Sequence, residues 1–445
     1  MNAKWEKMNP STILVLGFAS LIFIGAFLLI LPIATENKEG ISFLNALFTA
    51  TSATCVTGLV VLDTGDTFSL FGEVVILALI QVGGLGFMTF ATLLFTLVGK
   101  KISLKDKIVL KEAYNATSIA GILQLVKRIF LFTLLMEVTG GLILAMRFIE
   151  EMPVGQAIYY GFFHAISNFN NAGFDVMGEF HSLTHYVDDP FVVLTISTLI
   201  IMGGLGFIVV NELVEYRNTR RLSLHTKIVL STTMILLVGG TILLFLFEFT
   251  NEKTLGSLSP VGKVLGAWFH SVTPRTAGAN TLSMTDLTDA TLLLTIFLMF
   301  IGGGAGSTAG GIKVSTFTVL MVTAFSQIKG QEDVTVFKRR LVISTILKAL
   351  TVALSGAMII VTVTFLLSLT EKNDDVIVYL FEATSAFGTV GLSMGLTPEL
   401  STFGRILIMI TMFLGRLGPI TIGLAIANRR TKEAYHYQKG NVMIG

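Results

Sequence analysis

The feature that most constrains this chain is a short pattern that occurs four times: an aromatic stretch, a polar turn and a single glycine. The copies LFTATSATCVTG, FFHAISNFNNAG, WFHSVTPRTAG and LFEATSAFGTVG end at Gly58, Gly173, Gly278 and Gly391. Counted back from each glycine, a phenylalanine recurs, with one residue fewer in the third copy: Phe48, Phe163, Phe269 and Phe381. Four similar polar loops in one apolar chain predict a pore with pseudo-fourfold symmetry.

Long apolar stretches surround these loops. The chain is 53% hydrophobic and only 13% charged, and a soluble domain of this size would carry more charge. Stretches of about 20 apolar residues can cross a bilayer. Eight such stretches occur in pairs, and each pair brackets one loop: 11–33, 73–98, 125–148, 190–214, 228–249, 290–326, 343–369 and 403–427.

The repeating unit is therefore a helix, a short re-entrant helix, a loop and a second helix. Irregular backbone at membrane depth must be buried in protein or line water. We predict an all-α membrane protein with eight transmembrane helices and one pore per subunit. The expected divisions are 1–99 for repeat 1, 100–216 for repeat 2, 217–340 for repeat 3, 341–428 for repeat 4 and 429–445 for a cytoplasmic C-terminal segment.

Composition also excludes several classes of protein. The single Cys55 rules out an intrachain disulfide and a multi-cysteine metal site. Basic residues flank the apolar stretches instead of forming one patch, which argues against nucleic-acid binding. Residues 11–33 are too long and too uniformly apolar for a signal peptide, so we expect them to be the first membrane helix.

The distribution of charge predicts an orientation. Basic residues mark the cytoplasmic side of membrane proteins. Here they gather near the N-terminus, at 100–128, at 217–227, at 329–348 and after 428, whereas the other side carries acidic loop residues. Both termini should then be cytoplasmic, with the four loops entering from outside beneath an acidic surface that attracts cations. Individually, these acidic residues are equally consistent with ordinary solvated loops.

Backbone carbonyls in the four loops are candidate ion ligands. A dehydrated cation needs several oxygens at fixed distances, and four loops around an axis supply rings of them. Side chains differ between the loops while the glycine repeats, which fits backbone chemistry. The alternative is that each glycine only caps a short helix. The candidate carbonyl donors are Cys55, Val56, Thr57, Gly58, Asn170, Asn171, Ala172, Gly173, Arg275, Thr276, Ala277, Gly278, Gly388, Thr389, Val390 and Gly391.

Two histidines occupy equivalent positions in the second and third copies. His164 and His270 stand where the other copies have Thr49 and Glu382. No further ligand cluster is evident in the sequence, so we expect polar packing behind the loops and no transition-metal site.

A second glycine-containing pattern follows each loop. Repeats 1 and 2 have the sequence GGLG at 83–86 and 203–206, where small residues allow close helix packing or bending. Repeat 3 has the longer GGGAGSTAGG, which cannot easily stay helical and should line an aqueous path. We predict an intramembrane gate loop at 302–312, with these residues: Gly302, Gly303, Gly304, Ala305, Gly306, Ser307, Thr308, Ala309, Gly310 and Gly311.

Two basic residues accompany this second pattern. Arg416 stands in repeat 4 where the other repeats have glycine, and an intramembrane arginine is costly and by default functional. It could project into the pore, pair with loop carbonyls or form a structural salt bridge. Lys313 follows the predicted gate and could act similarly or cap the loop.

Other functions fit the sequence less well. No strand precedes GGGAGSTAGG and Ile312 follows it where a phosphate-binding loop needs lysine, so nucleotide binding is excluded there. The motifs HExxH and GxSxG are absent, and no aspartate pair lies at membrane depth, which argues against a membrane-embedded enzyme. A secondary transporter for another monovalent cation or ammonium remains an alternative, although such folds usually repeat twice.

Taken together, these motifs resemble those of the Trk/Ktr/HKT superfamily of potassium transporters, and the chain is most similar to Ktr-type membrane subunits. The resemblance covers essentially the whole chain and rests on the four single-glycine loops, the GGGAGSTAGG interruption and Arg416. It implies channel-like potassium uptake across the cell membrane, in some members dependent on sodium. Glycine at Gly58 favours potassium, because a serine at the first loop accompanies sodium transport in plant relatives.

The resemblance also implies partners. It predicts a homodimer with one pore per subunit and a cytoplasmic KtrA-like ring that binds ATP or ADP and controls the gate. The basic cytoplasmic loops and residues 429–445 would supply the docking and dimer surfaces. We find no nucleotide-binding domain in this sequence, so no cofactor is expected in this chain beyond the transported potassium and, potentially, sodium.

Overall fold

The computed structural model describes residues 9–97, 102–113, 121–372 and 375–426. Within these ranges the chain is almost entirely helical, and the only strands are the two-residue pair β1 (Thr335–Val336) and β2 (Arg339–Arg340). The predicted C-terminal segment 429–445 lies outside the described residues, as do Lys4, Lys7, Lys100, Lys101 and Asp374.

Four long apolar helices begin the four repeats. Each is long enough to cross a bilayer, and together with the helices below they confirm the predicted fold class. Their surfaces carry large exposed apolar side chains, as expected for contact with lipid. The four helices are α2 (Pro10–Ile30), α8 (Ile122–Phe148), α12 (Leu224–Glu248) and α16 (Ile343–Thr370).

A short helix follows each long one. The short helices have 13 to 16 residues, which correspond to about 20–24 Å and cannot span a hydrocarbon layer of about 30 Å. Serine caps fix two of their starts: Ser42 Oγ accepts from Asn45 N at 3.3 Å and Ser259 Oγ from Gly262 N at 3.0 Å. They are α3 (Phe43–Cys55), α9 (Val154–Phe169), α13 (Pro260–Val272) and α17 (Val376–Gly388).

The second helix is broken in every repeat, although the sequence predicted an interruption only in the third. In repeats 1 and 2 the two halves meet at 96° and 98°, at Gly86 and Gly206, whose φ angles of 82° and 98° cannot continue a helix. In repeat 4 Gly418, with a φ of 82°, separates the two halves. The halves are α5 (Leu70–Leu85) and α6 (Phe87–Leu97), α10 (Pro190–Gly204) and α11 (Phe207–Thr219), α14 (Asp289–Phe300) and α15 (Val314–Ile328), and α19 (Thr402–Leu417) and α20 (Pro419–Ile426).

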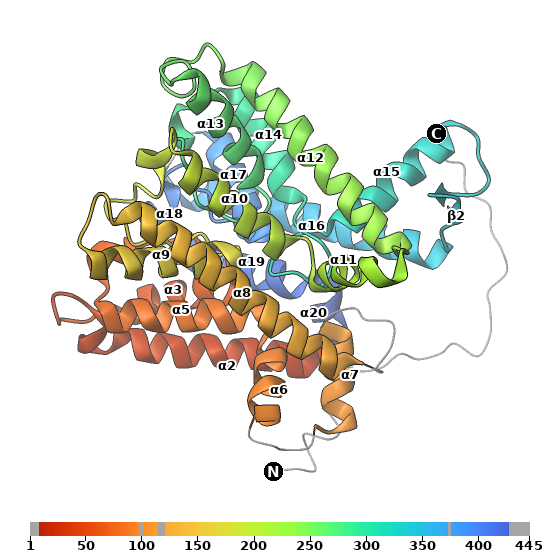
Figure 1. The fold of residues 1–445 in the computed structure, drawn as a ribbon, viewed down its shortest axis with the longest axis horizontal. Coiled ribbons are helices and arrows are strands. Elements are labelled where there is room, and N and C mark those ends of the chain that lie inside the picture. The colour runs from red at the N-terminus through yellow and green to blue at the C-terminus, as the bar shows by residue number, and fades with distance from the viewer. Residues whose placement is uncertain (1–8, 98–101, 114–120, 373–374, 427–445) are drawn as a thin grey trace.

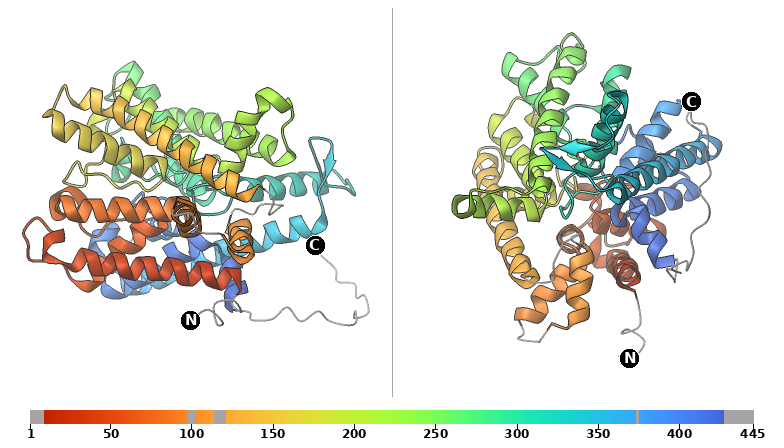
Figure 2. Two further views of the ribbon diagram at one scale, coloured as in Figure 1. Left: turned by 60° about the horizontal axis from the view of Figure 1, so that its bottom comes forward. Right: turned by 90° about the vertical axis from the view of Figure 1, so that its right-hand side faces the viewer.

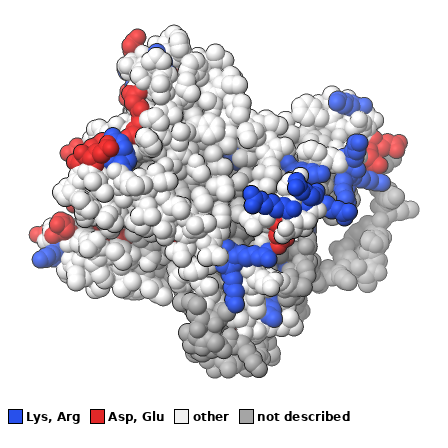
Figure 3. Space-filling view, viewed as in Figure 1, with Lys and Arg blue, Asp and Glu red and all other residues white. Residues whose placement is uncertain are grey.

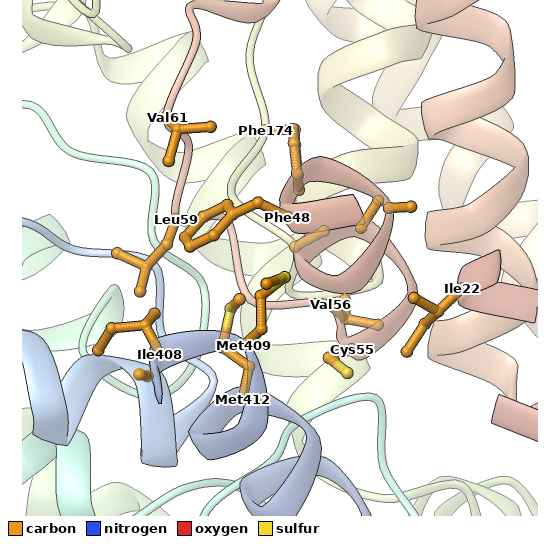
Figure 4. Packing of buried hydrophobic residues seen from close by; sticks show 14 of the residues in the cluster. Ile22, Phe48, Cys55, Val56, Leu59, Val61, Phe174, Ile408, Met409 and Met412 are labelled. Atoms are coloured by element: carbon orange, nitrogen blue, oxygen red, sulfur yellow. The ribbon is translucent and has the colours of Figure 1, made fainter. Parts of the chain in front are cut away.

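The repeats close into a ring. The second helix of each repeat packs against the short helix of the next: α5 on α9, α10 on α13, α14 on α17, and α19 back on α3. In the right-hand view of Figure 2 the colours from red to blue succeed one another around the molecule. Figure 4 shows the closing contact, where Ile408, Met409 and Met412 of α19 lie beside Phe48 and Cys55 of α3.

Short connecting elements complete the fold. In Figure 1 the short helices lie toward the left, α6 lies at the bottom, and α11, α15 and the strands lie toward the right. Figure 3 shows that Asp and Glu gather at the left end and Lys and Arg mainly at the right. The remaining elements are α4 (Thr64–Thr67), α7 (Leu104–Ala113), α18 (Leu396–Glu399) and the 3₁₀ turns Pro32–Ala34, Thr184–Tyr186 and Met284–Asp286.

Candidate ion-conducting site

The four glycines that ended the repeated pattern meet in a closed ring. A Cβ added to Gly58 would lie 2.4 Å from the carbonyl oxygen of Ala172, and one on Gly173 would lie 2.4 Å from that of Ala277. The contacts continue from Gly278 to Val390 O at 2.4 Å and from Gly391 to Thr57 O at 2.2 Å. Any side chain here would strike the backbone of the next repeat. We call Gly58, Gly173, Gly278 and Gly391 the glycine ring.

The backbone of each loop has the same unusual conformation. Every ring glycine has a positive φ, between 66° and 97°. The residue two positions earlier is also left-handed although it has a side chain, with φ of 58°, 59°, 76° and 50° for Val56, Asn171, Thr276 and Thr389. This is a strained choice for valine and threonine. Its recurrence in all four loops shows that the fold imposes it.

The ring lies just beyond the C-terminal ends of the four short helices. The last carbonyl groups of a helix have no partner within it, and the C-terminus carries about half a negative charge. Cys55 and Gly388 are the final residues of α3 and α17. Four such ends, together with loop carbonyls, create a site that could hold a desolvated cation without any fixed carboxylate.

A hydroxyl side chain supports each loop, and the sequence prediction missed it. Ser52 and Ser385 accept from the ring amides of Gly58 and Gly391, each at 3.1 Å. In the other loops Ser167 and Thr273 donate to the carbonyl that follows the glycine. The four backbone oxygens of these residues also accept from the amide just before the glycine, at 2.8–3.0 Å. The signal was present, because Ser, Ser, Thr and Ser occupy matching places in the four copies.

One candidate carbonyl donor, Asn170, also makes hydrogen bonds through its side chain. Asn170 directs its side chain away into a buried polar network, where Nδ2 donates to Gln81 Oε1 at 2.9 Å and to Glu137 Oε1 at 3.0 Å. Gln81 Nε2 in turn donates to Glu137 Oε2 at 3.3 Å. An intramembrane carboxylate is expensive, so its partners matter. This network joins loop 2 to α5 of repeat 1 and α8 of repeat 2.

The predicted gate region, which we call the glycine-rich loop (302–311), lies directly against the ring loops. A Cβ on Gly310 would lie 2.0 Å from Thr389 Oγ1. Thr308 Oγ1 donates to Asn171 Oδ1 at 2.9 Å, and Gly304 N donates to Gly204 O at 2.7 Å in the break of repeat 2. The loop is ordered by neighbours on several sides and contains no helix.

Three basic side chains donate to carbonyls of this loop. Arg416 donates to Thr308 O and also to Gly83 O and Gly84 O of repeat 1, the last at 3.1 Å. Lys313 Nζ donates to Ala309 O at 2.6 Å, and Arg275 reaches Gly302 O at 3.4 Å. Of the three roles that the sequence left open for Arg416, the geometry brings it to loop carbonyls.

The two histidines are buried residues of the short helices α9 and α13. His164 Nδ1 is 2.7 Å from Tyr160 O, and His270 Nε2 is 3.1 Å from Thr295 Oγ1. Glu382 accepts from Ser393 Oγ at 3.1 Å. In the described part of the chain no group of three His, Cys, Asp or Glu residues could hold a metal ion.

One carboxylate follows the ring on its acidic side. Asp175 is two residues beyond Gly173, and its Oδ1 accepts from Met177 N at 3.1 Å. Burial, opposed by the hydrogen bond from Met177 N, raises the pKa of Asp175 to about 7; the nearby Asp63 and Asp66 carboxylates act in the same direction as burial and His181 acts against it. Near neutral pH this group can change charge beside the ring.

The chain is similar to known proteins along its whole length. Residues 2–435 match the family model TrkH, described as cation transport protein. The chain is 43% identical to the Ktr system potassium uptake protein B of Bacillus subtilis, with 99% of this chain and 98% of that protein covered. It is 39% identical to the potassium/sodium uptake protein NtpJ of Enterococcus hirae, with the same coverage.

A solved structure has the same fold. The potassium transporter TrkH from Vibrio parahaemolyticus superposes with a TM-score of 0.75 at 18% sequence identity, and the match covers 96% of this chain and 86% of that one. The match of the family model to nearly the full sequence, joined with the four-repeat architecture, shows that this chain belongs to the TrkH family of cation transport proteins.

Proposed function

We propose that this protein takes up potassium ions across the cell membrane through the axis of the glycine ring. The observation that supports this most strongly is the ring itself, in which four repeats present equivalent backbone around one axis. Carbonyl dipoles can replace the hydration shell of a potassium ion. The names of the two relatives, a potassium uptake protein and a potassium/sodium uptake protein, point to the same class of ion.

The acidic and basic ends of the molecule support an orientation in the membrane. Acidic residues lie at the end where the loops open, and basic residues gather at the other end. By the positive-inside rule the ring opens to the outside and both termini are cytoplasmic. An ion would then meet the acidic surface, the ring and finally the glycine-rich loop.

The glycine-rich loop is the proposed gate. It lies against the ring loops and is fixed by side chains from repeats 3 and 4. A Ktr-type assembly provides a means of control: a cytoplasmic KtrA-like ring that binds ATP or ADP would dock on the basic loops, and the chain itself would form a homodimer. Crosslinking of purified membranes with and without the partner, read as the mass of the complex, tests this assembly.

Substitution in the ring tests the transport mechanism. A Gly391→Ser side chain would collide with Thr57 O, so we expect the preference for potassium over sodium to fall by more than about tenfold, equivalent to about 1.4 kcal/mol. The measurement is uptake of ⁸⁶Rb⁺ and ²²Na⁺ in cells that lack other potassium systems, with and without external sodium.

A matched control is available in the same repeat. Gly395 has φ of 89° but no atom within 4 Å of an added Cβ, so Gly395→Ser carries similar backbone strain without touching the ring. It should keep wild-type selectivity. Equal selectivity in Gly391→Ser and wild type would contradict the ring as the filter. Ammonium or sodium uptake that exceeds rubidium uptake in the wild type would favour the alternative, a transporter for another monovalent cation.

A further inference from the structure

A cavity at the basic end of the molecule is not part of the conduction path. It has a volume of about 290 Å³ and lies between the turn that precedes α12 and the β1–β2 hairpin. Two cations, one hydroxyl and three apolar side chains line it: Lys227, Arg339, Ser223, Leu222, Leu224 and Phe337. A space of this size fits a phosphate headgroup.

The charge in this cavity is not neutralised within the described residues. Arg340, next to Arg339, pairs with Asp333 at 2.9 Å, but no carboxylate forms an ion pair with Lys227 or Arg339. Glu212, on α11, accepts hydrogen bonds from Ser223 N at 3.0 Å and Thr226 Oγ1 at 2.7 Å. Two exposed cations that share a cavity favour an anionic occupant.

The surroundings indicate that the occupant also has an apolar part. Lys227 lies in the first turn of α12, a helix that crosses the membrane. Met234 and Val238 follow at spacings of seven and eleven residues, which places them on the same helix face as Lys227, and both are exposed. A headgroup at Lys227 would therefore have its acyl chains along an apolar stripe.

We propose that this cavity binds the headgroup of an anionic phospholipid from the membrane leaflet at the basic end. Lys227 and Arg339 contact the phosphate, and Leu222, Leu224 and Phe337 cover the glycerol and upper acyl chain. Basic pockets beside transmembrane helices recognise lipids in this way. The bound lipid would join the hairpin to α12 and so link the connection between repeats 3 and 4 to the membrane surface. This proposal does not depend on which ion is transported.

The test uses the full-length protein purified in detergent without any partner. Dioleoylphosphatidylglycerol, dioleoylphosphatidylcholine and glycerol 3-phosphate are added separately, and bound lipid is counted by native mass spectrometry alongside the thermal unfolding midpoint. Phosphatidylglycerol alone should bind and stabilise. Stabilisation by glycerol 3-phosphate to the same extent, or equal binding of the two lipids, would overturn the proposal.

Variants localise the site. Each basic side chain near a membrane surface contributes about fivefold to the affinity for anionic lipid, so K227Q/R339Q should weaken phosphatidylglycerol binding by about 30-fold. R217Q/K338Q removes the same charge from the same end without lining the cavity and should have little effect. An equal loss of phosphatidylglycerol affinity in both double variants would show only a general attraction of anionic lipid to the basic end and would overturn the proposal. A K227Q/R339Q protein that keeps its lipid binding but no longer binds a nucleotide-binding partner would assign the surface to that partner.

Discussion

The four repeats contribute in equivalent ways to the glycine ring but in different ways to the layer of broken helices beside it. In the ring, every repeat contributes a glycine, a left-handed residue two positions earlier and a supporting hydroxyl. In the adjoining layer the repeats differ: repeats 1, 2 and 4 break at a single glycine, repeat 3 has a ten-residue loop, and repeat 4 carries Arg416 two residues before its glycine. Selection of a spherical ion benefits from equivalent ligands, whereas a gate needs one element that can move independently.

Removal of the glycine-rich loop tests this comparison most severely. Ile301 and Ile312 already lie side by side, with Gly302 N donating to Ile312 O at 2.8 Å, so excising 302–311 allows the ends to be joined. Minor conformers of two-state proteins are commonly populated at about 1%, so unregulated ⁸⁶Rb⁺ flux should rise by as much as about a hundredfold.

Selectivity in the same variant is the internal control, because the ring glycines are untouched. Unchanged ⁸⁶Rb⁺ flux in a loop-deleted protein that elutes like the wild type would contradict the assignment of this loop as the gate. Thr308→Val provides a milder version, since it removes only the hydrogen bonds of one hydroxyl, to Asn171 Oδ1 at 2.9 Å and to Phe169 O at 3.4 Å.

The next largest effect is expected from Arg416→Gln. The arginine ties the glycine-rich loop to repeat 1, and a hydrogen bond from a charged donor contributes about 1.5 kcal/mol or more. Flux should rise by about tenfold while the potassium preference stays the same. Arg405→Gln is the control, because Arg405 lies on the same helix and also donates to carbonyls, those of Leu400 and Pro398. A change of selectivity in Arg416→Gln would show that the glycine ring and the layer of broken helices do not have separate roles.

A smaller effect, this time in the glycine ring, is expected from Ser385→Ala. The loss of the bond to Gly391 N costs about 1 kcal/mol, so the potassium over sodium preference should fall by up to about fivefold with little change in flux. Ser401→Ala removes a similar bond, to Gly404 N at 3.1 Å, at the start of α19 and should leave selectivity unchanged. Competition between ⁸⁶Rb⁺ and sodium measures both.

The smallest effect concerns pH. Because burial raises the pKa of Asp175 from about 3.8 to about 7, ionisation is disfavoured in the folded state and stability is lost as pH rises through this range. Asp175→Asn should remove that loss, so the thermal midpoint of the variant minus that of the wild type should increase from pH 5 to pH 8. Asp289→Asn, at the start of α14, is the control. A trend of the opposite sign would show that a cation or donor neutralises Asp175.

The sequence predicted the architecture well because its signals are local. Apolar runs marked the long helices, and repeated glycines marked the loops that meet in the ring. The supporting hydroxyls Ser52, Ser167, Thr273 and Ser385 were visible in the aligned copies but not recognised, since serine and threonine are common in many roles.

Other features depend on contacts between distant parts of the chain. A single glycine in an apolar helix is tolerated, so nothing local distinguished the sharp breaks at Gly86 and Gly206 from ordinary close packing. Arg416 contacts Thr308 and Gly83, which are 108 and 333 positions away in the sequence. No local pattern can choose among its three possible roles, because the choice depends on which repeat lies opposite.

The contact between Gly391 and Thr57 has a consequence for how the protein is made. It joins the last repeat to the first, so the ring cannot close until the fourth repeat has entered the membrane. Chains emerge N-terminus first, and contacts between distant residues form late. The first three loops therefore form only an incomplete ring until the fourth repeat is inserted. If ions pass through the glycine ring, as we propose, a chain truncated before Gly391 should transport no potassium.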